Sequence, residues 1–331
     1  MTNKNIIIAE IGSTHDGSIY LAKKSIEVAA KSGADAVKFQ MHIAEEETLK
    51  NAPSPKYFNK EPRFDYFKRT AFTFNQWKKI INYCKKNKVE FLCSPFSSKA
   101  VDILEKLKVK KYKIPSGEVT NLPMLKKIAK TNKQVLLSTG MSNWKEIKKA
   151  SSIFKKKNLI VLQCSSQYPC SLNNVGVNIF EEIKKKIKCD FGYSDHTIGF
   201  SASFLAASLG AKVIEKHFTL SKKLYGSDAK FSMEPLDFKF FCKTLKEIWK
   251  IKKRPIDKNN LNKYLTMKRV FEKSIVSKKF IKKGKIVTIN DLDFKKPGNG
   301  ISPENIKKII GKKVKKNIKH NVILKLSDFY D

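Results

Sequence analysis

Two histidines are the most chemically suggestive residues in this chain. His196 and His217 each follow a short apolar run, and Asp195 and Glu215 stand close to them in the sequence. Imidazoles at the ends of neighbouring parallel strands can face one another, and such a pair can bind a divalent metal ion. Water, a carboxylate or a substrate then supplies the remaining ligands of the ion. The alternative is that each is a hydrogen-bonded packing histidine. Because the two come together, we favour a metal site.

A second set of polar side chains also stands where apolar runs end. It consists of Lys38, Lys113, Ser94, Ser116, Ser138 and Ser194. Ammonium groups and hydroxyls from several strand ends can hold a phosphate or a carboxylate through charge-assisted hydrogen bonds. A single serine at a strand end is usually only a cap, but four at equivalent positions favour an anion site.

Two glutamates complete the chemistry-bearing residues. Glu10 and Glu118 follow apolar runs that we expect on opposite sides of the site. Either carboxyl can act as a general acid or base if partial burial raises its pKa. The alternative is a solvated or salt-bridged glutamate, paired for instance with Lys38 or Lys113.

The elements that must position these residues alternate regularly. Eight apolar runs read as strands, at residues 6–9, 36–37, 91–93, 112–114, 134–137, 159–162, 191–193 and 213–214. Segments with helical periodicity follow them, at residues 21–32, 75–86, 101–107, 122–129, 144–154, 177–187 and 200–209, and from Pro235 onward. This pattern over about 250 residues predicts an α/β fold, a (β/α)8 TIM barrel, whose strand ends surround one pocket.

The remaining sequence suggests three further segments. Residues 44–73, the longest interruption, follow the second strand at the catalytic end and are typical of a lid or substrate loop. We expect the barrel to span residues 1–255 and a polar linker to span 256–272. A small β-rich domain is expected over 273–331, with β-like pieces at 274–276, 286–288, 292–294 and 322–324.

Composition favours a cytoplasmic enzyme. At 331 residues and 41% hydrophobic content the chain can form a full core, and no apolar run approaches the roughly 20 residues of a membrane span. The start does not resemble a signal peptide. The six cysteines have neither CxxC pairs nor zinc-ligand spacing, so we expect buried, reduced thiols.

A formal net charge of +38 is typical of proteins that bind nucleic acids or anionic membranes. The chain has only four arginines, however, and base and phosphate recognition tends to use the arginine fork. The lysines are dispersed over predicted exposed helix faces. We therefore expect no specific nucleic acid and no membrane as partners, and attribute the charge to compositional drift.

Many short motifs occur in a characteristic order. They are Ala9-Glu10-Ile11-Gly12 with His15-Asp16-Gly17, Val37-Lys38-Phe39-Gln40, Ser94-Pro95-Phe96, Lys113-Ile114-Pro115-Ser116-Gly117-Glu118, Leu137-Ser138-Thr139-Gly140-Met141, Tyr168-Pro169, Gly192-Tyr193-Ser194-Asp195-His196-Thr197 and Glu215-Lys216-His217-Phe218-Thr219. Together they closely resemble the sialic acid (N-acetylneuraminate) synthase family. The tail resembles the antifreeze-like (SAF) domain of that family through Lys273-Ser274-Ile275-Val276, Ile281-Lys282-Lys283-Gly284 and Lys296-Pro297-Gly298-Asn299-Gly300.

The resemblance implies a condensation of phosphoenolpyruvate with an open-chain N-acetylmannosamine-type sugar, giving a nine-carbon 2-keto acid and phosphate. By family analogy His196 and His217 hold Mn²⁺ or Mg²⁺, which polarises the aldehyde. Phosphoenolpyruvate lies among Lys38, Lys113, Ser94, Ser116, Ser138 and Ser194, while Gln40, Tyr168 and Asp228 face the sugar. Glu10 or Glu118 manages the protons of the water that adds. The resemblance also implies a domain-swapped homodimer, in which each tail caps the barrel mouth of the other subunit.

Several positions depart from the family pattern. Ser166 stands where some members have an asparagine near phosphoenolpyruvate, and Lys296 replaces an arginine that a partner subunit supplies to the N-acetyl group. Thr14 and Ala229 replace a common asparagine and histidine. These changes cluster on the sugar side, so a diacetamido-trideoxy hexose, of the legionaminic or pseudaminic acid type, is an alternative acceptor.

Two other functions stay open at this point. One is a different phosphoenolpyruvate-dependent enzyme, such as a 3-deoxy sugar-phosphate synthase, which needs a further basic clamp for the phosphate of its acceptor. The other is a non-catalytic protein whose tail binds a glycan or whose lysine surface binds polyanions.

Overall fold

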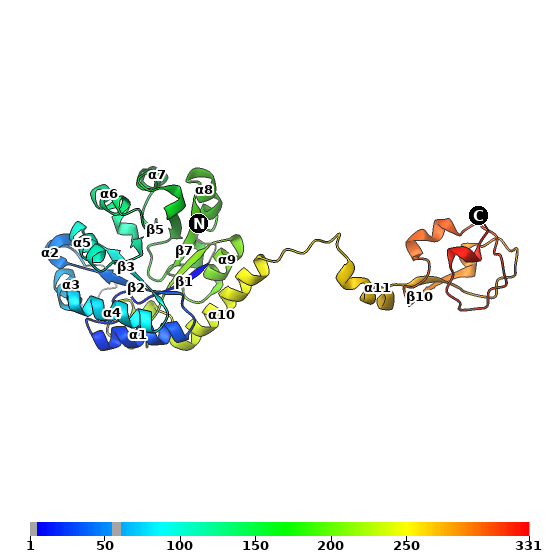
Figure 1. Cartoon of the computed structure of the whole chain (residues 1–331), viewed down its shortest axis with the longest axis horizontal. Coiled ribbons are helices and arrows are strands. Elements are labelled where there is room, and N and C mark those ends of the chain that lie inside the picture. The colour runs from blue at the N-terminus through cyan, green and yellow to red at the C-terminus, as the bar shows by residue number, and fades with distance from the viewer. Residues whose placement is uncertain (1–4, 55–60, 331) are drawn as a thin grey trace. The chain divides into compact units, whose positions relative to one another are not determined.

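The chain forms two units (Figure 1). Each unit has its own hydrophobic core. The computed structural model describes residues 5–54 and 61–330. Contacts divide the chain into Met1–Arg254 and Pro255–Asp331. All six cysteines are free thiols. No helix in the described parts of the chain is long and apolar enough to cross a membrane.

The first unit is a closed barrel of eight parallel strands. These are β1 (Ile6–Glu10), β2 (Ala36–Met41), β3 (Glu90–Pro95), β4 (Lys111–Ile114), β5 (Gln134–Ser138), β6 (Leu159–Cys164), β7 (Asp190–Asp195) and β8 (Val213–His217). Their order is β3-β2-β1-β8-β7-β6-β5-β4, and contacts between β3 and β4 close the ring. Since β1 pairs in parallel with both β2 and β8, the first strand joins the last. The predicted TIM-barrel fold is confirmed.

Helices surround the strands at nearly the predicted positions. They are α1 (Ile19–Lys31), α4 (Phe74–Lys86), α5 (Ser98–Lys106), α6 (Leu122–Lys130), α7 (Trp144–Ser152), α8 (Ile179–Lys186), α9 (Ser201–Leu209) and α10 (Pro235–Lys252). In α4 a capping box between Thr73 and Gln76 starts the helix, and its buried stripe includes Trp77 and Cys84. Such one-sided apolar stripes keep the helices on the outer face of the barrel.

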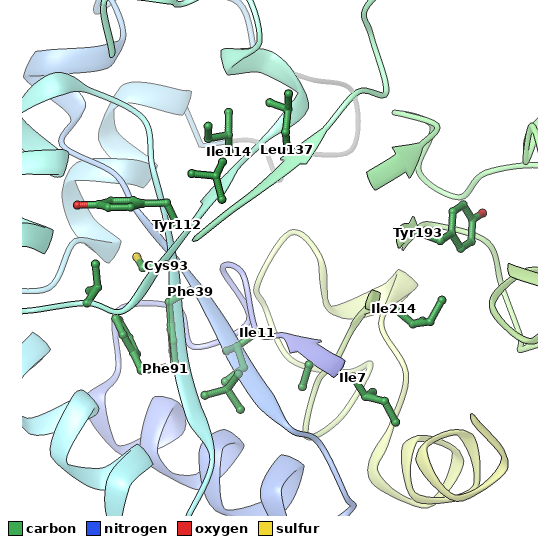
Figure 2. Packing of buried hydrophobic residues seen from close by; sticks show 14 of the residues in the cluster. Ile7, Ile11, Phe39, Phe91, Cys93, Tyr112, Ile114, Leu137, Tyr193 and Ile214 are labelled. Atoms are coloured by element: carbon green, nitrogen blue, oxygen red, sulfur yellow. The ribbon is translucent and has the colours of Figure 1, made fainter. Parts of the chain in front are cut away.

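Alternation along each strand divides the side chains between two faces. One set, to which Ile7, Phe39 and Tyr112 belong, packs outward against the helices in the main core cluster (Figure 2). The intervening residues point into the barrel and form a separate apolar layer. That inner layer consists of Ile6, Ile8, Ala36, Leu92, Leu136, Ile160, Leu162 and Val213.

The polar residues of the predicted site continue this inward series toward the carboxyl ends of the strands. Lys38 comes two positions after Ala36, and Ser138 comes two positions after Leu136. Because successive side chains in a strand alternate between faces, a residue two positions beyond an inward apolar residue also points inward. The inside of the barrel therefore has an apolar layer below a polar mouth.

The segment over residues 44–73, which we expected to form a lid or substrate loop, contains two helices. They are α2 (Ala44–Glu47) and α3 (Arg63–Thr70), while residues 55–60 lie outside the described part of the chain. Ala44, Phe64, Tyr66 and Phe67 form a small buried cluster that joins the two helices. The segment thus has a hydrophobic core of its own, because its aromatic residues recur at helical spacing on α3.

The second unit is less regular than its sequence suggests. Only β9 (Ser274–Ser277) and β10 (Leu292–Lys295) pair as strands among the described residues, in antiparallel register. The β-like pieces at residues 286–288 and 322–324 form single bridges, through Ile286 and Ile323. Part of the expected linker is helical, at α11 (Leu265–Phe271). The unit instead consists of turns wrapped around ten buried apolar residues, among them Ile281 and Ile318.

Candidate active site

A cavity of about 440 Å³ lies at the polar mouth of the barrel. Twelve of the predicted site residues line it, namely Glu10, Lys38, Gln40, Lys113, Ser116, Ser138, Ser166, Tyr168, Ser194, His196, His217 and Asp228. They come from β1, β2, β4, β5, β7 and β8 and from the loops that follow the strands. The structure therefore brings most of the predicted set together.

A buried network of charges forms the floor of the cavity. Lys113 Nζ donates to Glu215 Oε1 at 2.8 Å, and Ser194 Oγ donates to the same oxygen at 3.0 Å. Lys38 Nζ lies 3.4 Å from that oxygen and 3.0 Å from Glu10 Oε2. Burial would raise the pKa of Glu215, but the Lys113 and Lys38 charges outweigh it and lower the pKa to about 2. Glu215 is therefore an ionised carboxylate that holds two ammonium groups in place.

Glu10 behaves differently from Glu215 although it lies in the same network. Burial raises the pKa of Glu10 to about 7, against the opposing effect of the Lys38 charge. Gln40 Nε2 donates to Glu10 Oε1 at 2.7 Å. Glu10 is thus both paired with a lysine and able to exchange a proton near neutral pH, which suits a general acid or base.

The two histidines face one another across the ends of β7 and β8. Their ring centroids are 5.4 Å apart. His196 Nδ1 lies 2.8 Å from the Ser165 carbonyl oxygen, which can only accept, so Nδ1 carries the proton and leaves the Nε2 lone pair available. That Nε2 also lies 3.0 Å from the Tyr168 hydroxyl. Both ring nitrogens of His196 thus have hydrogen-bond partners, and a metal ion at Nε2 would take the place of the Tyr168 hydroxyl.

His217 has the chemistry of a metal ligand. Burial is the main cause that lowers its pKa to about 4, so the ring is neutral. Its Nδ1 is buried and has no hydrogen-bond partner among the described residues. A neutral imidazole at His217 beside the His196 ring fits a divalent ion, although no group of three or more His, Cys, Asp or Glu residues suited to a metal occurs in the described chain. Further ligands must then come from water or substrate.

Asp195, which the sequence places next to His196, faces away from the cavity. Its Oδ2 lies 2.9 Å from Lys216 Nζ, and its Oδ1 accepts from the Thr197 amide at 2.8 Å. Lys216 Nζ also donates to the Thr197 carbonyl at 2.6 Å. Asp195 occupies an outward position in β7 and does not line the cavity. The ion pair instead ties the ends of β7 and β8 together behind the two histidines.

A glycine makes room for the predicted sugar-facing aspartate. Asp228 Oδ2 accepts from the Ser13 amide at 3.3 Å. Gly12 has φ +51°, and a Cβ atom there would lie 2.5 Å from Asp228 Oδ2. Only glycine permits both this backbone conformation and this close approach, so the turn after β1 fixes the position of Asp228.

Three predicted site residues do not line the cavity. Ser94 is fully buried, and its Oγ lies 3.4 Å from Lys38 Nζ. Glu118, in a short 3-10 turn (Ser116–Glu118), accepts from Asn121 Nδ2 at 2.8 Å. Lys296 belongs to the second unit, where its Nζ lies 5.0 Å from the centre of the Phe271 ring.

The structure adds a wall of residues that sequence reasoning missed. His42 Nδ1 lies 2.7 Å from Glu47 Oε1, and His42 Nε2 lies 3.0 Å from Gln40 Oε1. The His42 ring stacks between Phe67 and Phe96, with centroid distances of 3.7 and 4.1 Å. His42 continues the alternation of Lys38 and Gln40, so this signal was present in the sequence. Glu215 carries the same signal, since it lies two positions before His217.

These features define a TIM-barrel protein with a pocket for an anionic and polar ligand at the carboxyl ends of its strands. Comparisons with known proteins identify the family. The NeuB family model matches residues 25–257, and the SAF domain model matches residues 272–329. The chain belongs to the NeuB family, which confirms the resemblance to the sialic acid synthases and to their C-terminal SAF domain.

Individual relatives match over nearly the whole chain. The N,N'-diacetyllegionaminic acid synthase of Campylobacter jejuni is 41% identical over 97% of this chain and 99% of its own. The pseudaminic acid synthase of the same species is 34% identical over 99% of this chain and 98% of its own. Among solved structures, the sialic acid synthetase of Leptospira borgpetersenii, in complex with citrate, has a TM-score of 0.71 and 29% identity. That match covers 80% of this chain and 92% of the synthetase.

Proposed function

We propose that this protein condenses phosphoenolpyruvate with an open-chain diacetamido-trideoxy hexose to give a nine-carbon 2-keto acid of the legionaminic or pseudaminic type and free phosphate. The choice of sugar rests on the relative named as a diacetyllegionaminic acid synthase, at 41% identity over 97% of the chain. N-acetylmannosamine, the leading expectation from sequence, becomes the second candidate. It is supported by the sialic acid synthetase at 29% identity.

The anion cradle is the observation that carries the proposal. Lys38 and Lys113 are both buried in the cavity floor, and only Glu215 is a fully ionised counter-charge to them. Burial raises the pKa of Glu10 to about 7, so its carboxyl opposes the two ammonium charges less than Glu215 does. Ser138 Oγ is also buried without a hydrogen-bond partner among the described residues, so it can donate to a ligand oxygen. This floor suits the phosphate and carboxylate of phosphoenolpyruvate.

The condensation can be written so that atoms and protons balance. C3 of phosphoenolpyruvate attacks the aldehyde carbon while water adds at C2, and the aldehyde oxygen becomes a hydroxyl by taking up one of the two protons of that water. The tetrahedral adduct then collapses to the 2-keto acid: the bond from C2 to the phosphate oxygen breaks, and the second proton leaves with the phosphate. Glu10 is the better candidate for relaying the first proton, because it lines the cavity and Glu118 does not. Fixed ammonium groups at Lys38 and Lys113 stabilise the charge that develops on the phosphate.

His196 and His217 are the residues that would hold a divalent ion, Mn²⁺ or Mg²⁺. When bound there, the ion supplies a Lewis acid for the aldehyde oxygen. The Ser165 carbonyl fixes the tautomer of His196, as partners of metal-bound histidines commonly do. A homodimer, with Lys296 of one subunit serving the other, is a further part of the proposal that rests on the family resemblance.

The test is a phosphate-release assay with purified protein, phosphoenolpyruvate, Mn²⁺ and a panel of acceptors. We expect release with the diacetamido hexoses and less with N-acetylmannosamine, together with a 2-keto acid product detected by mass spectrometry. A preference for a phosphorylated acceptor would favour a 3-deoxy sugar-phosphate synthase instead. Absence of release with every N-acylated sugar would refute the proposed function.

A further inference from the structure

We propose that Arg63 is a specificity-determining residue that donates hydrogen bonds to the carbonyl oxygen of the second N-acyl group of the acceptor sugar. This inference rests on the proposed function and extends it to a residue that the sequence did not single out. Arg63 begins α3, in the segment between β2 and α4, and its side chain lines the cavity. It is the only arginine among the described cavity residues.

The guanidinium of Arg63 has an unused hydrogen-bond donor. Its Nε is buried and has no hydrogen-bond partner among the described residues. A buried N–H group without a partner is unfavourable, and a ligand oxygen that accepts from it removes that penalty. Because this donor belongs to a cavity-lining side chain, a bound substrate is a natural source of the missing acceptor.

Aromatic stacking holds this donor in place before a ligand arrives. The Arg63 guanidinium carbon lies 5.3 Å from the centre of the Phe67 ring. Phe67 stacks on His42, which stacks in turn on Phe96. His42 is fixed at both ring nitrogens, by Glu47 and Gln40. A guanidinium on such a platform loses little side-chain freedom when it binds, which favours selective recognition.

The charges around Arg63 favour a neutral ligand group over a second anion. Burial raises the pKa of Glu118 and Glu47 raises it further, whereas the Asn121 hydrogen bond, His42 and Arg63 oppose the rise. The carboxyl groups of Glu118 and Glu47 therefore lie close enough to act electrostatically on this region, although neither lines the cavity. The lysines that suit an anion lie in the floor, apart from this group. An amide carbonyl is a neutral acceptor that the guanidinium can bind here without further negative charge.

The position of Arg63 points to the second acyl group. In a diacetamido-trideoxy hexose the first acetamido group lies next to the aldehyde carbon, so it must stay near the reacting centre. The second acetamido group lies two carbons farther along the sugar. Arg63 comes from a helix beyond the strand ends, so it reaches the outer part of the cavity. Phe67, Phe96 and Met141 line the same cavity and offer apolar contacts to the acetyl and terminal methyl groups.

N-acetylmannosamine lacks the second acyl group, so a single substitution tests the inference. We expect Arg63→Ala to lower kcat/KM for the diacetamido hexose by about 10- to 100-fold, mainly through KM, because a site built to bind a polar group loses its partner. The value for N-acetylmannosamine is expected to change less than about threefold, since that sugar leaves this donor unused. Arg63→Lys should retain part of the activity, because it keeps the charge without the fork.

Lys68→Ala is the matched control on the same helix. Lys68 is 65% exposed and pairs with Glu45 at 3.2 Å outside the cavity. The substitution Lys68→Ala removes one positive charge from α3 and should leave the kcat/KM values for both sugars unchanged. If the Arg63 variants have the same KM for phosphoenolpyruvate as the wild type, and the same thermal shift when phosphoenolpyruvate is added, they keep the folded cavity. An equal loss with both sugars, or no loss with the diacetamido sugar, would overturn the inference.

The wild-type protein separates failure of the inference from failure of the proposed function. If it releases phosphate only with N-acetylmannosamine, the synthase activity stands and the role of Arg63 is wrong. If it releases none with any sugar, calorimetric titration with the diacetamido hexose decides the question. Binding by the wild type that Arg63→Ala weakens at least tenfold would support the recognition role alone. No binding by the wild type would overturn both.

Discussion

The Lys113 ammonium and the Glu215 carboxylate form a buried ion pair across the barrel mouth, with 2.8 Å between Nζ and Oε1. The two residues belong to β4 and β8, which are not neighbours in the sheet. The same carboxylate oxygen lies 3.4 Å from Lys38 Nζ. Glu215 therefore acts as a positioning residue that sets the spacing of the two lysines in the proposed anion cradle.

The first prediction concerns this carboxylate. Glu215→Gln keeps the shape of the side chain but leaves two buried ammonium groups with less counter-charge. Loss of one partner from a buried ion pair costs about 3–5 kcal/mol, so we expect a lower free energy of unfolding in urea. We also expect a higher KM for phosphoenolpyruvate, because the two lysines are no longer held at the same spacing. Glu181→Gln is the control, because the Glu181–Lys185 pair is exposed, and it should change stability by less than about 1 kcal/mol.

The second prediction concerns the pH dependence of stability that Glu10 causes. Its pKa rises from 4.5 to about 7 in the folded protein, because burial favours the neutral form. Between these values the folded state binds more protons than the unfolded state, so this contribution is complete below pH 4.5 and is lost as pH rises to 7. Integrated over that window, the loss is on the order of 3 kcal/mol.

The effect of Glu10 must be isolated from that of His217. The pKa of His217 falls to about 4, mainly through burial, so its contribution to stability changes with pH in the opposite direction. Urea unfolding of wild type and Glu10→Gln, measured from pH 4.5 to 8 without added divalent ions, gives the difference directly. We expect the stability of the wild type relative to the variant to fall across that range. A flat difference would show that the Glu10 carboxyl is not perturbed.

The third prediction tests the packing of the inner apolar layer of the barrel, to which Leu162 and Val213 belong. Gly192 is an inward position of β7, and a Cβ atom there would lie 2.5 Å from both Leu162 Cδ2 and the Val213 carbonyl oxygen. Gly192→Ala should therefore destabilise the protein by about 1–3 kcal/mol, measured by urea unfolding. At Gly117 the nearest atom to an added Cβ lies 3.7 Å away, so Gly117→Ala is the matched control and should be nearly neutral. Equal stabilities for the two variants would argue against the packing described here.

Alternation explains how far sequence reasoning could reach. Lys38, Ser138 and Ser194 were predicted because each stands where an apolar run ends, and the structure shows that each follows an inward apolar or glycine position by two residues. His42 and Glu215 obey the same rule and could have been found in this way. The depth of a side chain is a different matter. Ser94 points inward like the others but is fully buried and does not line the cavity, and no local pattern predicts that difference.

The outer wall of the cavity was beyond such reasoning. Arg63 and Phe67 come from α3, in a segment that lacks the strand and helix alternation of the barrel. Their contribution depends on how a small cluster around Phe64 and Tyr66 folds that segment back on itself. Tertiary packing of this kind leaves no regular period in the sequence, so only the structure brings Arg63 to the cavity.

The last prediction concerns the proposed metal. Neutral His217, with a buried nitrogen that has no partner among the described residues, and His196, with its tautomer fixed by Ser165, fit a divalent ion. We expect Mn²⁺ to bind the wild type in calorimetry and electron paramagnetic resonance, and His217→Ala to weaken binding by about 10- to 100-fold or more, as perturbation of metal sites commonly does. His320→Ala, a change at an exposed histidine of the second unit, should bind as the wild type does. Phosphate release should stop with a chelator and return with Mn²⁺. Release that neither the chelator nor His217→Ala affects would remove the metal from the proposed reaction and leave the imidazole pair as hydrogen-bonding groups.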